Sequence, residues 1–289
     1  MTPYEFVTAN RQRFLDELID LIKIPSVSTL SERKPDMLRA AAWLVEQLRD
    51  LGFTARQYET PGHPVVYGEW LQASDGAPTV LVYGHYDVQP AEVADGWDTE
   101  PFEPTLRDGK LYARGAADDK GQVFAHVKAV EALLKTEGRL PVNLKFIIEG
   151  EEENGSPNVK PFIEAHQDLL AADVIVVSDT HNRSLDTPLI IYALRGMTYM
   201  ELEVWGPDHD LHSGTYGGVV HNPAQALCEI VARLHDANGT ITVPGFYDRV
   251  IALSDEERDE LQKNPYTEPV LREETGVPAP WGEAEYRLD

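Results

Sequence analysis

The sequence predicts an α/β protein in which helices sandwich a mixed sheet, followed by part of a smaller α+β domain. Apolar runs rich in β-branched residues, at 79–83, 142–148 and 172–177, are typical of buried strands. Segments with helical periodicity lie between and before these runs. The pattern changes near residue 197, so we expect one domain at 1–196 and a second at 197–289.

Two helices should open the chain. Apolar residues from Phe6 to Ile22 recur at helical spacing, which predicts one amphipathic helix that ends before Pro25. A second helix fits residues 36–51, with Gly52 in the position that follows a C-cap.

Strands at 53–58 and 65–71 should lead into the strand at 79–83, which we expect Gly84 to end. Residues 94–110 then form a long polar stretch rich in turn residues, which indicates a loop. A helix should follow at 123–134, before the 142–148 strand.

The overall composition excludes several classes of protein. A net charge of −24 and a pI near 4.6 argue against a nucleic-acid partner, since phosphate binding requires clustered Lys and Arg. Cys228 is the only cysteine, which indicates a reducing compartment. The N-terminal residues lack the pattern of a signal peptide, and no apolar run approaches the roughly 20 residues that span a bilayer. We therefore expect a cytoplasmic protein without a membrane partner.

A first candidate for chemistry follows the 79–83 strand. His85 and Asp87 are two residues apart, and in an extended chain both side chains lie on one face. A carboxylate beside an imidazole is the pair that orients a metal-binding histidine. The H-x-D pattern alone is weak, so its interpretation depends on the motifs that follow.

A second candidate precedes the 123–134 helix, where Asp118 and Asp119 follow a glycine-containing turn. Acidic residues at a helix start often only complement the helix dipole. That alternative explains one aspartate more easily than two adjacent ones.

Two further apolar strands end in acidic residues. Glu151, Glu152 and Glu153 follow the 142–148 strand, and Asp179 follows the 172–177 strand. A solvated loop is one explanation of the glutamates, but crowded like charges near a core repel unless a cation or protons compensate them. Three separate apolar strands thus each deliver histidine or acidic residues at their carboxyl ends, and a fourth acidic cluster lies at a helix start. Because chance placement of all four is unlikely, the sequence predicts a site for zinc, manganese or cobalt.

The second domain has a different pattern. Residues 199–204 alternate between apolar and polar, which predicts a half-exposed strand. Asn222 and Pro223 should start a helix that runs to about residue 234. The capping-box spacing of Ser254 to Glu257 predicts another short helix. The tail, residues 276–289, contains no clear closing element.

Taken in order, the motifs resemble those of a known family. The motifs are GHYDVQP, RGAADDKG, EGEEENGSPN, VVSDTHN and DLHSGTYGG. They resemble the co-catalytic metallopeptidases that include carnosinase-like dipeptidases, glutamate carboxypeptidase and aminoacylase, and are most similar to the carnosinase-like branch. The resemblance extends from the KIPSVS segment at Lys23 through at least Pro223. Five motifs in order are far more specific than any one of them.

The resemblance implies a site with two divalent metal ions, zinc first and manganese or cobalt as alternatives. His85 and Asp179 would bind one ion, and Asp87 would orient His85. Asp118 would bridge the two ions, with a cis peptide bond to Asp119, and Glu153 would bind the second ion.

For catalysis, the resemblance implies that Glu152 is the general base. His212, in a lid domain that also forms a homodimer, would polarise the substrate carbonyl in the partner subunit. The other histidines match no role in the family and are interpreted as surface or packing residues; they are His63, His126, His166, His181, His209, His221 and His235.

One departure from the family pattern affects the second metal ion. In the family, the chain returns from the lid to the catalytic domain and supplies a final histidine ligand. This sequence stops before such a return, so we expect the ion at Glu153 to be one ligand short. For these 289 residues we therefore expect at most one tightly bound metal, little or no peptidase activity, and a tendency to self-associate through uncovered apolar surface or an uncovered strand edge.

The expected function is metal-dependent hydrolysis of dipeptides or short peptides by a metal-activated water with a glutamate base. Hydrolysis of N-acyl amino acids is the alternative within the same chemistry. The alternative from another class is an inactive fragment that only binds metal or dimerises.

Overall fold

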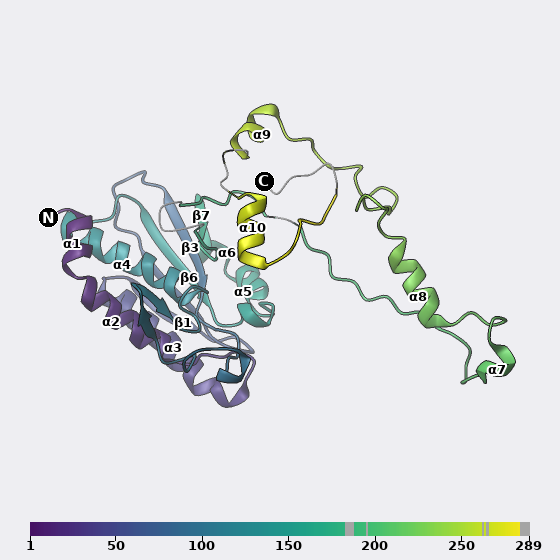
Figure 1. Ribbon diagram of the computed structural model, residues 1–289. Coiled ribbons are helices and arrows are strands. Elements are labelled where there is room, and N and C mark those ends of the chain that lie inside the picture. The colour runs from purple at the N-terminus through teal and green to yellow at the C-terminus, as the bar shows by residue number, and fades with distance from the viewer. Residues whose placement is uncertain (183–187, 195, 262, 264–265, 284–289) are drawn as a thin grey trace. The chain divides into compact units, whose positions relative to one another are not determined.

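The computed structural model describes residues 1–182, 188–194, 196–261, 263 and 266–283 (Figure 1). The chain divides into two compact units, Met1–Leu194 and Arg195–Asp289, which we call unit 1 and unit 2. The last six residues of the tail, 284–289, lie outside the described residues.

Unit 1 contains a sheet in the order β1-β2-β6-β3-β7. Strands β1, β2 and β6 pair antiparallel, whereas β3 pairs parallel with both β6 and β7. The sheet is therefore mixed, as predicted. Its strands are β1 (Thr54–Tyr58), β2 (Val65–Trp70), β3 (Thr79–His85), β6 (Asn143–Glu149) and β7 (Val174–Val177).

The helices of unit 1 cover both faces of this sheet (Figure 1). One face carries Val66, Val82 and Phe146, in the same core as apolar residues of α2, α3 and α4. The opposite face packs against α5 and α6, through Phe162 and Leu170. The helices are α1 (Pro3–Ala9), α2 (Arg11–Ile22), α3 (Lys34–Asp50), α4 (Lys120–Glu137), α5 (Val159–Ala165) and α6 (Gln167–Leu170), and the 3₁₀ turns are η1 (Ser31–Arg33), η2 (Val93–Asp95) and η3 (Glu152–Asn154).

Two expectations about the first half of the chain are wrong. The opening segment is two helices, α1 and α2, separated by Asn10. Apolar residues recur at helical spacing in both helices, so periodicity alone does not reveal the cap residue between them. Gly84 does not end β3, which continues through His85. A side chain at Gly84 would meet Val123 and Asp119, so the glycine permits close packing of α4 on the strand.

The polar stretch at 94–110 is only partly a loop. It contributes η2 and most of a small hairpin formed by β4 (Thr105–Arg107) and β5 (Lys110–Tyr112). The turn between them is Asp108-Gly109, and both residues have positive φ values of 51° and 76°. Asp-Gly between short strands is a known hairpin signal, so the sequence contained the information that would have predicted it.

Unit 2 has helices α7 (Ser213–Tyr216), α8 (Pro223–Ala232), α9 (Asp255–Leu261) and α10 (Glu268–Thr275). The cap of α8 is confirmed, because the Asn222 side chain accepts a hydrogen bond from the Ala224 N–H at 2.9 Å. The capping box of α9 is also confirmed, with reciprocal bonds between Ser254 and Glu257. The strand expected at 199–204 is wrong: within the part of unit 2 that the structure describes, this segment has no strand partner, and alternation alone does not supply one.

Among the described residues, none of the helices is long and apolar enough to cross a membrane.

Candidate metal centre

The parallel strands β3, β6 and β7 bring three of the predicted segments to one edge of the sheet. His85 is the last residue of β3, and β6 ends at Glu149, directly before the turn that contains Glu152. Asp179 follows the end of β7 by two residues. Carboxyl ends of parallel strands are where open α/β sheets place their binding sites.

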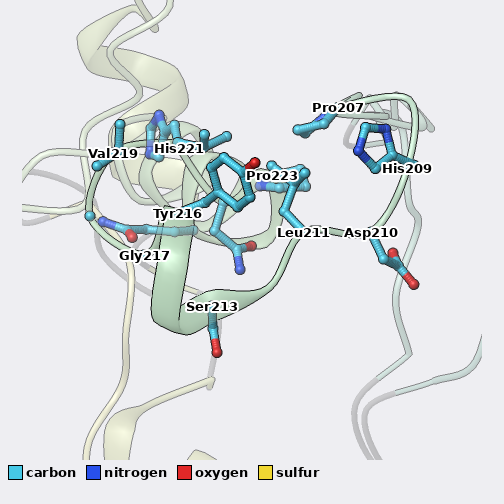
Figure 2. Close-up of a pocket in the computed structure, with 15 residues that line it drawn as sticks. Pro207, His209, Asp210, Leu211, Ser213, Tyr216, Gly217, Val219, His221 and Pro223 are labelled. Carbon is cyan, nitrogen blue, oxygen red and sulfur yellow. The ribbon is translucent and has the colours of Figure 1, made fainter.

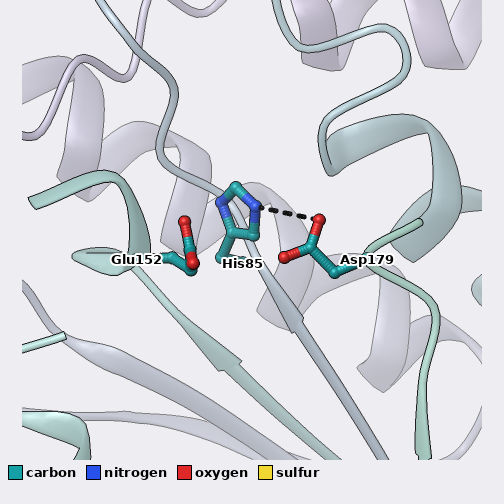
Figure 3. A group of neighbouring side chains, drawn as sticks. All are labelled: His85, Glu152 and Asp179. Atoms are coloured by element: carbon teal, nitrogen blue, oxygen red, sulfur yellow. Dashed lines mark ion pairs between the residues drawn. The ribbon is translucent and has the colours of Figure 1, made fainter. Parts of the chain in front are cut away.

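At this edge, ligand atoms of His85, Glu152 and Asp179 all lie within 4.8 Å of one another. Figure 3 shows the imidazole between the two carboxylates, with His85 Nε2 3.8 Å from Asp179 Oδ1. His85 is fully buried, and the two acids are partly buried. The structure thus assembles one ring nitrogen and two carboxylates from three separate chain segments.

The ring of His85 is fixed by its neighbours. Its Nδ1 lies 3.1 Å from the carbonyl oxygen of Asp87 and 3.3 Å from Asp87 Oδ1. The backbone N–H of His85 donates to Asp119 Oδ2 at 3.1 Å. Because Nδ1 is occupied in this way, Nε2 is the atom available to a metal ion.

Asp87 has a second contact that the sequence did not reveal. Its two carboxylate oxygens accept hydrogen bonds from the backbone N–H groups of Glu152 at 3.2 Å and Glu153 at 3.1 Å. Asp87 is fully buried. One carboxylate therefore positions both the histidine ring and the turn that carries the glutamates.

The Asp118–Asp119 peptide bond is cis, as the resemblance implied. Asp118 Oδ1 lies 3.1 Å from His85 Nε2, and its side chain is 59% exposed. Asp119 is buried, and one of its carboxylate oxygens has no hydrogen-bond partner. The two adjacent aspartates thus differ: Asp118 is exposed beside the His85 ring, and Asp119 is buried and binds the His85 backbone.

The charges of this cluster are unbalanced. Burial lowers the pKa of His85, but the hydrogen bond to Asp87 and the charges of Asp119 and Asp179 outweigh it and raise the pKa to about 10. Burial raises the pKa of Asp119 to about 7. Burial also raises the pKa of Glu152, with the charge of Asp179 adding to the effect. A group of acids that favours added positive charge, with an imidazole among them, fits a divalent cation of the zinc or manganese type.

Glu153 and His212 are not part of the three-residue group. The Glu153 carboxylate accepts a hydrogen bond from Gln89 Nε2 at 2.9 Å. His212 belongs to unit 2, where its Nδ1 accepts from the Gly214 N–H at 3.1 Å and so caps α7. The roles of both residues stay predictions.

Unit 2 also contains a pocket of its own, shown in Figure 2. Polar side chains line it, among them His209, Asp210, Tyr216 and His221. This pocket lies in unit 2, and the group of His85, Glu152 and Asp179 lies in unit 1.

Gln89, Glu149 and Tyr83 were not singled out from the sequence. Tyr83 and Ser156 both donate to Glu149 Oε1, at 2.7 and 2.8 Å, and so join the ends of β3 and β6 to the acidic turn. The only signal in the sequence was position, because Gln89 and Glu149 lie within motifs already quoted and Tyr83 directly precedes one of them. Side-chain contacts between motifs leave no pattern in a single sequence.

A histidine and carboxylate cluster at the carboxyl edge of a mixed sheet is typical of a metallohydrolase. The model of the family described as Peptidase family M20/M25/M40 matches residues 81–267. That is well over half of the chain, and the protein belongs to this family.

Several characterised proteins are similar to the chain. Cys-Gly metallodipeptidase dug1 of Schizosaccharomyces pombe is 35% identical over 95% of this chain and 60% of its own length. The human Beta-Ala-His dipeptidase is 38% identical over 88% of this chain and 53% of its own length. The crystal structure of human carnosine dipeptidase 1 matches with a TM-score of 0.73 and 36% identity, over 96% of this chain and 61% of that one.

These matches confirm the α/β fold class and the predicted resemblance to the carnosinase-like branch. The chain spans about half to three-fifths of the length of these relatives.

Proposed function

We propose that this protein hydrolyses the peptide bond of dipeptides or short peptides with the help of bound divalent metal ions. The observation that carries the proposal is the group of His85, Glu152 and Asp179, whose ligand atoms lie within 4.8 Å of one another. Family membership and the dipeptidase names of the relatives support the same reaction.

His85 and Asp179 would hold one ion, Asp118 would bridge to a second, and Glu153 would bind that second ion. When bound, such ions lower the pKa of a water molecule and polarise the carbonyl of the peptide bond. Zinc suits the imidazole, and manganese or cobalt suits the carboxylate-rich remainder. Asp87 would keep the His85 ring in its orientation by the contact at Nδ1.

Glu152 would be the general base. Its carboxylate lies within the group, at the start of η3, and its backbone N–H is fixed by Asp87. A carboxylate within hydrogen-bond reach of the attacking water can act as its general base. Glu152 would remove the proton from the attacking water and deliver it to the departing amine, while the new C–O bond forms and the C–N bond breaks.

Unit 2 would supply His212 to the active site of a partner subunit in a homodimer. The support for this role is the motif DLHSGTYGG and its place in the family resemblance. The cytoplasm is the proposed compartment, because Cys228 is the only cysteine in the 289 residues.

The test is hydrolysis by the full-length protein before and after treatment with a chelator. Turnover of a dipeptide should disappear with the metal and return when zinc, manganese or cobalt is added. A panel of dipeptides beside N-acetyl amino acids distinguishes a dipeptidase from a deacylase. Full turnover by a preparation shown to be free of metal would refute the proposal.

A further inference from the structure

Asp179 lies on a segment that the sheet holds only weakly. Its strand, β7, is at the edge of the sheet and pairs with β3 over four residues. Three of its four side chains are more than half exposed: Val174 at 51%, Ile175 at 64% and Val177 at 57%. Burial therefore contributes little to fixing the residues that follow β7, and a metal ligand there requires another support.

That support comes from helix α4. His126 Nε2 lies 2.7 Å from Ser178 Oγ, and Gln122 Nε2 donates to the carbonyl oxygen of Thr180 at 3.3 Å. The two contacts lie on either side of Asp179 in the sequence. Residues four apart on a helix share one face, so a single face of α4 holds the segment at two points.

The same helix is fixed to the other half of the site. Its N-cap is Asp119, whose carboxylate accepts the backbone N–H of His85. Val123 packs against β3 where Gly84 leaves room for it. Helix α4 therefore contacts the segments of both residues that would bind the first metal ion.

We propose that His126 and Gln122 are positioning residues that hold Asp179 at its place beside His85 in the metal site. This inference rests on the proposed function, because it assigns a support to one of the ligands. His126 itself contacts Ser178 rather than a ligand atom, and it is not part of the three-residue group.

The types of the two residues suit this role. Burial lowers the pKa of His126, so its ring is neutral at neutral pH and can form its hydrogen bond with the serine hydroxyl without adding charge near the site. Gln122 Nε2 also donates to the carbonyl oxygen of Ala117 at 2.5 Å, which ties the loop before Asp118 to the loop around Asp179. An apolar side chain at either position would keep the helix but lose these contacts.

The experiment measures Zn²⁺ affinity of the full-length protein by competition with a chromophoric chelator. His126→Ala and Ser178→Ala should each weaken binding about 10- to 100-fold, the range for groups that orient ligands. Because both remove the same hydrogen bond, the double variant should bind about as weakly as either single one. Gln122→Ala should also weaken binding, and His126→Gln should recover most of the affinity, because a glutamine amide can replace the hydrogen bond to Ser178.

His166→Ala is the matched control, since it removes a half-buried histidine of unit 1 that stacks on Phe162 at 4.3 Å. It should lower the melting temperature and leave Zn²⁺ affinity unchanged. If His126→Ala does not fold, the pair His126→Gln and Gln122→Ala decides the question.

Unchanged affinity in the folded variants, or losses that multiply in the double variant, would overturn the inference while the proposed function stands. A wild-type protein that does not bind Zn²⁺, Mn²⁺ or Co²⁺ would instead overturn the proposed function, and the inference with it.

Discussion

The two units of the protein differ in what holds their helices in place. In unit 1, α3 buries six residues and α4 buries eight, and the apolar ones belong to a core shared with strands of the same unit. In unit 2, α7, α8, α9 and α10 bury none of the residues that the structure describes. Large apolar side chains in unit 2, such as Tyr199, Trp205 and Ile251, are exposed.

The helices of the two units are therefore stabilised by different interactions. Burial of apolar surface contributes about 25 cal/mol per Å², so a helix with several buried residues gains several kcal/mol from packing. A helix without buried residues depends on its caps and on side-chain pairs along its surface, each contributing about 1 kcal/mol or less. Substitutions in unit 1 should therefore have larger effects than matched substitutions in unit 2.

The largest effect is expected at the candidate metal centre of unit 1. Glu152→Gln should lower kcat by about 10²–10⁴-fold, because proton transfer is lost while the amide keeps the shape of the side chain. Metal content should stay the same, since His85, Asp118 and Asp179 are unchanged. Turnover of a dipeptide and metal analysis on the same sample provide the measurement.

Glu151→Gln is the control for position within the acidic run. The Glu151 carboxylate accepts from Asn158 Nδ2 at 2.7 Å and lies against Gly62, outside the three-residue group. If Glu151→Gln destroyed turnover and Glu152→Gln preserved it, the general base would be one residue away from its proposed position.

A second prediction tests whether unit 2 takes part in catalysis, although its large apolar side chains are exposed. His212→Ala and Glu152→Gln should each inactivate the full-length enzyme. Mixed and allowed to exchange subunits, they should recover about a quarter of wild-type activity, because half of the dimers would be mixed and each would have one intact site. Each variant incubated with itself is the control, and no recovery despite proven exchange would argue against action across a dimer.

A third effect compares a buried charge with an exposed one. Lys128 is buried on α4, where Nζ contacts Glu17 at 2.5 Å and Glu131 at 3.0 Å. Lys128→Met leaves Arg13 to pair with both carboxylates, so the opening free energy of α4 should fall by about 1.5–3 kcal/mol, the range for a hydrogen bond to a charged group. Hydrogen exchange of the α4 amides measures it.

Arg272→Met on α10 is the matched change in unit 2. Arg272 and Glu268 form a pair at 3.2 Å in which both side chains are more than half exposed. Exposed pairs contribute less than about 1 kcal/mol, so exchange of the α10 amides should change little. If both substitutions lowered the opening free energy equally, Arg272 would stabilise α10 by more than this exposed ion pair.

Whether an element could be predicted from the sequence depends on whether its side chains are buried. Strands β3 and β6 and helices α3 and α4 were predicted because their apolar residues are buried by partners, and burial is what produces a period in the sequence. The 199–204 segment has a strand pattern but no strand partner among the described residues, so its alternation misled the prediction. The β4–β5 hairpin was missed because its side chains are mostly exposed and only the Asp-Gly turn marked it.

The candidate site was predictable where side chains that can bind metal lie at the ends of predicted strands. His85 ends an apolar strand, Glu152 and Asp179 follow two others, and parallel pairing of β3 with β6 and β7 brings the strand ends together. The contacts of Asp87 with two backbone N–H groups and of His126 with Ser178 join segments 52 or more residues apart. A single sequence does not encode which distant residues meet, so these supports required the structure.

The smallest effect tests whether local caps hold unit 2. Helix α3 forms without a side-chain cap, whereas Asn222 caps α8 through the Ala224 N–H. Asn222→Ala should therefore lower the opening free energy of α8 by about 1 kcal/mol, seen as faster exchange of its first amides. Gln225→Ala, which removes only the exposed contact with Glu229, should change it by about 0.2–0.5 kcal/mol. If Asn222→Ala left exchange unchanged, α8 would be stabilised by packing rather than by its cap, and the contrast between the units would not extend to this helix.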